Sequence, residues 1–196
     1  DNFDTWELSG TFLGFETEGK HVEFINQSRL FRYNAYTSIR SAGRIRVEEV
    51  SPKRSMSKGR LLLDYCRLVL LAKFMGGQNG TREVMPRQVF EKFSRMAAIR
   101  AVGYRVPDGR SRAFCTLACI PATSSRLLVS DPLFNIHAED LATGQPLAVS
   151  VITREPIAYQ VKGHYAGKRL GAGVIDLSEC FSASPPLCGE RLDHSS

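Results

Sequence analysis

The chain has 196 residues, of which 43% are hydrophobic and 23% are charged. These fractions are close to those of globular domains, which excludes a disordered chain, and the length suits one or two domains with a substantial core. The net charge of +6 at neutral pH is a modest excess and fits a small anionic ligand as well as it fits nucleic acid. Because the chain has no base-stacking aromatic motif, we expect no nucleic-acid partner.

The five cysteines include no Cys-x-x-Cys pair. An odd number in this pattern argues against a disulfide framework and a zinc site, so we expect a cytoplasmic protein without a metal. The most apolar stretch, residues 61–75, is short and contains Asp64, Arg67 and Lys73, which excludes a membrane span there. The chain begins at Asp1, close to a predicted strand, so we expect further residues upstream.

The first 55 residues predict a strand–helix–strand arrangement. Apolar residues alternate over residues 5–19, which indicates a strand pair or one long bent strand, with Gly10 and Gly14 as bend points. Residues 20–37 fit a helix loosely. Residues 44–50 alternate apolar and charged side chains, as a half-buried strand does.

A basic linker and an apolar helix are expected next. Residues 51–60 are rich in small and basic side chains, which is typical of a solvated loop. Residues 60–76 are apolar on most sides and end at two glycines, which predicts a helix buried on several sides.

The remaining chain predicts one further helix and a series of strands. Pro86 stands where a helix can begin without losing a hydrogen bond. Cys115 and Cys119 fall in one predicted strand and are expected in the core. A short helix is expected at 135–143, and the predicted strands are 97–106, 113–120, 126–130, 147–152, 157–165 and 174–181.

The last of these strands carry a family resemblance. Tyr159-Gln160-Val161-Lys162-Gly163 follows a buried strand and precedes residues 174–181 and 184–192. Together they resemble the end of the pyridoxamine 5'-phosphate oxidase-like FMN-binding split-barrel family, over roughly residues 84–192. The resemblance implies an α+β, mainly β fold: an FMN-binding split β-barrel with flanking helices. It also implies a homodimeric flavoprotein, an FMN-dependent oxidoreductase acting on a small molecule.

Two stretches near opposite ends of the chain are also similar to each other. Residues 5–10 align with residues 158–163, and residues 44–52 align with residues 174–180. This similarity predicts a partial tandem repeat: half a barrel in residues 1–55, a linker with the apolar helix in 56–83, and a barrel domain in 84–192. The alternative is that two β-rich stretches look alike by chance.

In the family, basic and hydroxyl side chains hold the flavin phosphate, often including a Lys-Thr type pair in the short helix before the fourth strand. Residues 135–140 contain neither a lysine nor a hydroxyl. The resemblance therefore leaves other candidates for cofactor contact, each of which can equally be an exposed polar side chain of a strand or turn, and it names no catalytic residue. These candidates are Arg112, Thr116, Ser124, Ser125, Arg126, His137, Gln160 and Lys162.

Two other functions remain open from the sequence. The departure at 135–140 favours a degenerate, cofactor-free barrel that acts as a binding or assembly module. A haem protein of the same fold would use His137 or His164 as axial ligand. A hydrolase is disfavoured because the chain has no Gly-x-Ser-x-Gly motif.

Overall fold

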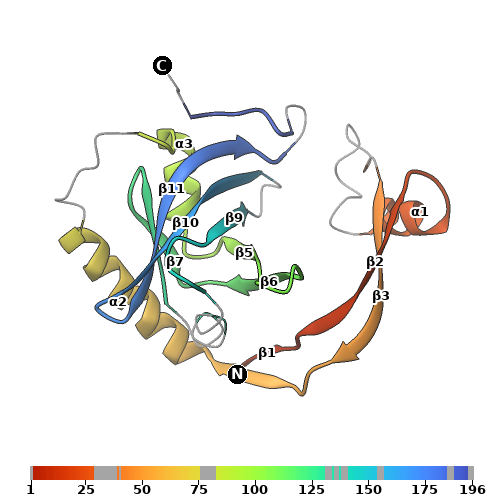
Figure 1. Ribbon diagram of the computed structural model, residues 1–196, viewed down its shortest axis with the longest axis horizontal. Coiled ribbons are helices and arrows are strands. Elements are labelled where there is room, and N and C mark those ends of the chain that lie inside the picture. The colour runs from red at the N-terminus through yellow and green to blue at the C-terminus, as the bar shows by residue number, and fades with distance from the viewer. Residues whose placement is uncertain are drawn as a thin grey trace. The chain divides into compact units, whose positions relative to one another are not determined.

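The computed structural model describes residues 2–28, 39, 41–75, 83–130, 134, 137, 141–153, 157–184 and 188–193. The chain divides into two compact units, Asp1–Met56 and Ser57–Ser196, which are described separately (Figure 1). Strands predominate in both units, so the fold is α+β and mainly β. No helix in the described part of the chain is long and apolar enough to cross a membrane.

The first unit consists of two strand pairs and a short helix. Strand β1 (Asn2–Thr5) pairs with β4 (Arg54–Ser57), and β2 (Leu8–Glu16) pairs with β3 (Ala42–Val50). Helix α1 (Lys20–Gln27) follows β2. The β2–β3 register shifts just before Gly10 and again just before Gly14. The prediction that these two glycines bend the strand is confirmed, whereas β4 lies where the sequence predicted only a loop.

The second unit is built on a curled, seven-stranded antiparallel sheet in the order β6-β5-β9-β10-β11-β8-β7 (Figure 1). The strand bounds are β5 Ile99–Arg105, β6 Ser111–Thr116, β7 Cys119–Thr123, β8 Arg126–Val129, β9 Pro146–Ile152, β10 Ala158–Arg169 and β11 Ala172–Ser182. Strands β10 and β11 are the longest of the seven. Their register also shifts at two places, just before Gly163 and just before Gly167.

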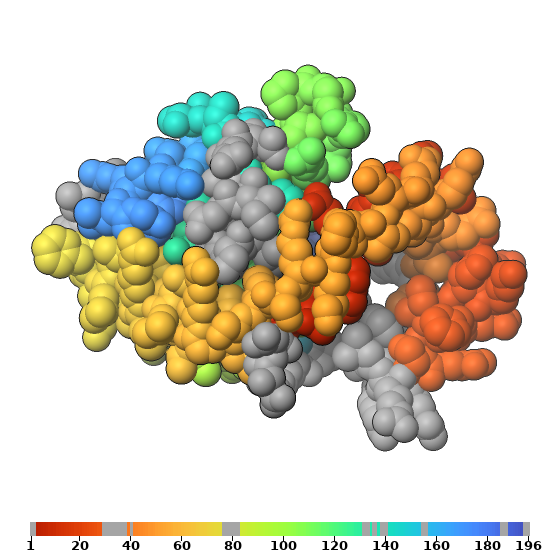
Figure 2. Space-filling model, turned by 90° about the horizontal axis from the view of Figure 1, so that it is seen from below, coloured from red at the N-terminus to blue at the C-terminus, as the bar shows by residue number. Residues whose placement is uncertain are grey.

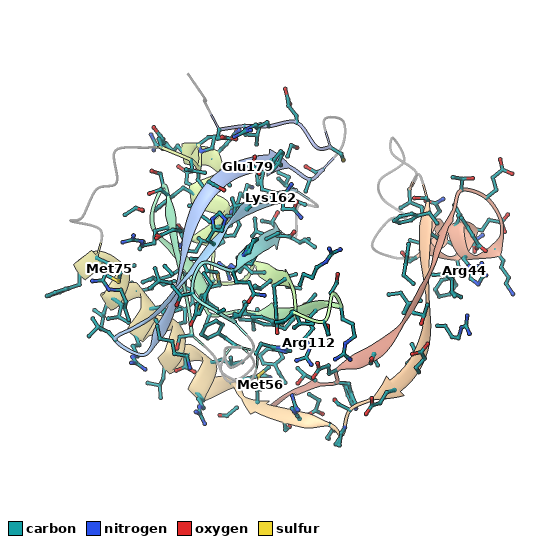
Figure 3. The ribbon with its side chains drawn as sticks, viewed as in Figure 1. Arg44, Met56, Met75, Arg112, Lys162 and Glu179 are labelled. Carbon is teal, nitrogen blue, oxygen red and sulfur yellow. The ribbon has the colours of Figure 1, made fainter. Side chains whose placement is uncertain are left out.

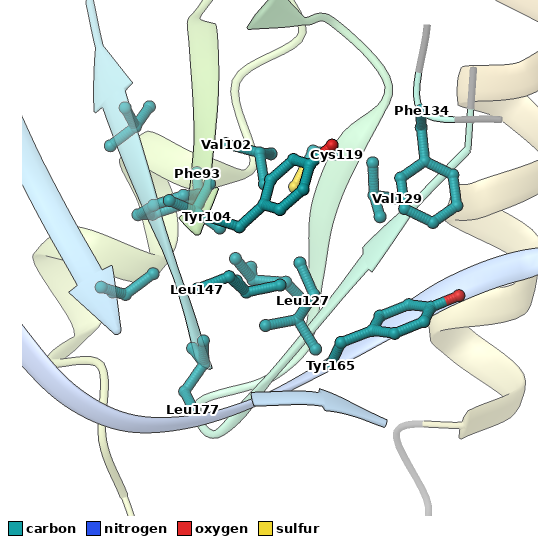
Figure 4. Packing of buried hydrophobic residues seen from close by; sticks show 14 of the residues in the cluster. Phe93, Val102, Tyr104, Cys119, Leu127, Val129, Phe134, Leu147, Tyr165 and Leu177 are labelled. Carbon is teal, nitrogen blue, oxygen red and sulfur yellow. The ribbon is translucent and has the colours of Figure 1, made fainter. Parts of the chain in front are cut away.

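The core of this unit follows from the alternation of the strands. Every second residue is buried along β5 and β9, where Val102, Leu147 and Val149 face inward. Tyr104, Phe134 and other large side chains fill the space inside the curled sheet (Figure 4). Helix α3 (Arg87–Phe93) begins directly after Pro86, as predicted, and adds Val89 and Phe93 to the same core.

Helix α2 (Lys58–Met75) is buried along one stripe only. Leu68 is fully buried where the helix packs on β7 and β8. Leu63 and Phe74, in contrast, are 72% and 86% exposed, and α2 lies on the face of the molecule drawn in Figure 2. The expectation that this helix is buried on several sides is therefore wrong for the single chain.

The predicted strand over residues 113–120 is in fact two strands, β6 and β7. The break lies at residues 117–118, where the Ala118 N–H donates to Thr116 Oγ1 at 3.1 Å and the chain turns away from β5. Cys119 is buried, but Cys115 is exposed on β6, so only one of the two is a core residue. The helix predicted at 135–143 lies largely outside the described residues.

Candidate functional site

The eight residues predicted to contact a cofactor lie in separate parts of the second unit. Arg112 and Thr116 lie on the inward side of β6, the side on which Phe114 is buried, because each is two residues away from Phe114 in the strand. Gln160 and Lys162 lie on the outward side of β10, because the intervening Val161 is buried. Figure 3 shows Lys162 close to Glu179, with Arg112 in a different region of the sheet.

Of the candidates on the inward side, Thr116 and His137 are buried, whereas Arg112 is only half-buried. Thr116 is buried, and its hydroxyl accepts the hydrogen bond at the β6–β7 break. The His137 imidazole is stacked on Phe114, with ring centroids 4.6 Å apart, and its Nδ1 lies 3.1 Å from the Tyr104 hydroxyl. With 4% of its surface exposed, His137 is placed for packing and not for binding a phosphate from solvent.

Ser124 and Ser125 form the turn between β7 and β8, and their backbone carbonyl groups accept hydrogen bonds from other parts of the chain. The Met85 N–H donates to the Ser124 carbonyl, and the Leu177 N–H donates to the Ser125 carbonyl, both at 2.8 Å. The Ser125 hydroxyl also lies 3.2 Å from Thr123 Oγ1. These bonds tie the turn to β11 and to the segment before α3.

The outward side of β10, β11 and β8 collects the remaining candidates. Gln160 donates to the Ser150 hydroxyl at 3.2 Å, and the Lys162 ammonium lies 4.5 Å from the centre of the Phe181 ring. Arg126 Nε donates to Asp176 Oδ1 at 2.6 Å. The sheet thus brings Gln160, Lys162 and Arg126 onto one face, although each has a contact within the chain.

Carboxylates accompany the cations on this outward face. Glu179 is the register partner of Lys162 and lies 3.3 Å from Arg191. Arg191 also binds Asp193 through two bonds of 2.8 Å, and this hydrogen bonding lowers the pKa of Asp193 to about 2. A phosphate dianion placed here would meet carboxylates as well as cations, and like charges repel. These carboxylates weigh against a phosphate group at this part of the face.

One pocket of about 240 Å³ is lined by Glu83, Val84, Pro86 and Arg87, below the range of about 300–1,000 Å³ usual for small-molecule sites. None of the eight candidates lines it. Within the described ranges, no group of three or more His, Cys, Asp or Glu side chains is placed to hold a metal ion.

Comparison with protein-family models, with curated proteins and with solved structures found no match for this chain.

One feature of the outward face escaped the sequence analysis. Small, half-buried side chains, including Ala101, Ala148 and Ser150, occupy neighbouring positions on β5 and β9. Ile99 and Ile152 stand next to them, each 50% exposed. Strand alternation could have predicted this side of β9 from the sequence, because Ala148, Ser150 and Ile152 alternate with the inward Leu147, Val149 and Val151.

Proposed function

We propose that this chain is a cofactor-free, split-barrel-like module with a binding or assembly role. The observation that carries the proposal is the engagement of the candidate cofactor residues within the chain. His137 and Thr116 are buried, and Arg126 is paired with Asp176. A side chain that already satisfies its hydrogen bonds in the protein gains little from a ligand, because it must first give up those bonds.

The exposed apolar side chains support a role in association. Ile99 and Ile152, each 50% exposed, border the small residues on the outward side of β5 and β9. Exposed apolar side chains that lie together mark protein–protein interaction sites or ligand-binding grooves.

The second candidate function is the FMN-dependent oxidoreductase implied by the sequence resemblance. Gln160 and Lys162 favour it, because they stand beside the small side chains Ala148 and Ser150, which leave room for a flat ring. The flavin would supply hydride transfer, and these residues would position it.

The absorption spectrum of the purified protein and titration with FMN separate the two functions. For the cofactor-free module we expect no flavin band near about 450 nm, no haem Soret band, and no FMN uptake. Saturable FMN binding that Lys162→Ala abolishes, and that the control Lys168→Ala retains, would overturn this proposal and establish the second function. Lys168 lies on the same strand, beyond the outward-facing Gln160 and Lys162.

A further inference from the structure

The hairpins β2–β3 and β10–β11 share an unusual backbone feature. The first register shift falls just before Gly10 in β2 and just before Gly163 in β10. A Cβ atom at Gly10 would overlap the carbonyl oxygen of Arg46, and one at Gly163 would overlap that of Asp176. In both hairpins the glycine therefore allows the facing strand to approach at the bulge.

The second register shift also occurs at the same place in both hairpins. It falls between Phe12 and Gly14 in β2, and between Tyr165 and Gly167 in β10. Gly14 and Gly167 both have positive φ, at 113° and 94°. The two bulge glycines are four residues apart in each strand, so the two hairpins bend at the same points.

The two hairpins differ in what covers their apolar face. In β10–β11 this face is buried in the core: Val161, Tyr165, Ile175, Leu177 and Cys180 are each at most 8% exposed. The equivalent positions in β2–β3 are also apolar but stand in solvent: Leu8 is 62% exposed, Phe12 53%, Ile45 64%, Val47 48% and Val50 55%.

Such a face is unstable without cover. A two-stranded ribbon is marginal in water, and a contiguous apolar patch of this kind marks an interaction site. Phe15 extends the patch, because its ring packs edge-on against Phe12 with centroids 5.0 Å apart. Among the described residues of this unit, only Val22 and Ala42 are buried hydrophobics, so the unit has almost no core of its own.

We infer that β2–β3 repeats the strand pair β10–β11, and that its apolar face binds the β2–β3 pair of a second copy of this chain. A twofold interface brings one patch against itself, so the patch must tolerate its own charges. The charged Arg44, Arg46 and Glu49 of β3 stand between the patch positions Ile45, Val47 and Val50 and lie on the opposite face, so the patch itself carries no charge that would repel a second copy. Two hairpins with the same bend can stack their apolar faces and share one core, as the sheets of a sandwich do.

The area is sufficient for a dimer. Six patch residues and Trp6 are about half exposed or more, which amounts to on the order of 700–800 Å² per copy and matches the about 800 Å² per partner of a standard interface. This inference rests on the assembly role proposed above and names its partner. The two proposals can fail independently, because FMN uptake tests the first and the oligomeric state tests the second.

The test measures the oligomeric state and the environment of Trp6 together. Trp6 is the only tryptophan of the chain and is 55% exposed beside the hairpin. We expect sedimentation velocity to show a concentration-dependent dimer, and the tryptophan emission to shift to shorter wavelength as that dimer forms.

Substitutions on the two faces of the hairpin locate the interface. Phe12→Lys and Val47→Lys place a charge in the apolar patch and should weaken the dimer by about 100-fold or more. Thr11→Lys is the matched control, because Thr11 is next to Phe12 but pairs with Arg46 on the opposite face. A chain that stays monomeric at all concentrations, or a dimer that tolerates both patch variants without a change in Trp6 emission, overturns the inference.

Discussion

Arg100 is a charged side chain with none of its surface exposed. Its guanidinium donates to the carbonyl oxygens of Phe93 and Arg95 at 2.5 Å, of Ala98 at 2.7 Å and of Leu117 at 3.2 Å. Burial lowers the pKa of Arg100, yet arginine remains charged at any ordinary pH. The planar guanidinium therefore ties the end of α3 to the break between β6 and β7, a role for which lysine has the wrong shape.

We predict that Arg100→Met destabilises the second unit by about 3 kcal/mol, because several buried carbonyl groups lose a charged donor. The stability of Arg100→Lys should lie between that of Arg100→Met and that of the wild type. Urea unfolding followed by circular dichroism measures the difference. Arg105→Met, at the exposed end of the same strand, is the control and should change stability by less than about 0.5 kcal/mol; equal losses in the two methionine variants would contradict the role given to Arg100.

Asp193 holds the segment after β11 against that strand. It accepts from Arg191 and from the Cys180 N–H, the latter at 3.2 Å. Its pKa of about 2 in the folded chain lies below the value of about 3.9 in an unfolded chain. A lowered carboxyl pKa stabilises the fold fully above about pH 4, and this contribution is lost as the pH falls toward 2.

We therefore predict that Asp193→Asn removes up to about 2 kcal/mol at neutral pH and flattens the decline in stability between about pH 4 and 2. Urea unfolding over that pH range measures the effect on the whole unit. Hydrogen exchange of the Cys180 amide, which should become faster in the variant, measures the local contact. Parallel pH profiles for the two proteins would rule out this linkage.

At the scale of the elements, the bulge at Gly163 fixes how β10 and β11 pair. Gly163→Ala should cost about 2–3 kcal/mol, because the new methyl group would overlap the Asp176 carbonyl and force the strands apart. Thermal and urea unfolding of the wild type and of Gly163→Ala measure this loss of stability. Gly103→Ala is the matched control in the same sheet, since the nearest atom to its Cβ is the Arg112 oxygen at 3.9 Å. If both alanine variants are equally stable, the bulge does not depend on the glycine.

The sequence predicted strands well where one face is buried at every second residue. Strands β5 and β9 match their predicted ranges closely, because a run such as Leu147, Val149 and Val151 leaves little freedom in register. The β6–β7 break was missed because it depends on the hydrogen bond from Ala118 to Thr116, which alternation does not reveal. The exposure of α2 was also missed, since an apolar composition does not indicate which side of a helix is covered.

At the scale of the whole molecule, the candidate site was harder to predict than the fold. The candidates were chosen by residue type, but their contacts come from distant parts of the chain. Asp176 is 50 residues from Arg126, and Tyr104 is 33 residues from His137. Whether a polar side chain faces a ligand or an internal partner depends on these long-range contacts, so the sequence could nominate the residues without placing them together.

The division of the chain into two units leads to a final prediction. Trp6 reports on the first unit alone, whereas most of the strands belong to the second. Because the first unit buries so little apolar surface, we expect tryptophan fluorescence to change at lower urea than circular dichroism does in dilute solution. Val149→Ala, a substitution at a fully buried position, should lower the stability read by circular dichroism by about 2 kcal/mol and leave the Trp6 transition unchanged. Coincident transitions that shift together in this variant would mean that the two units unfold as one.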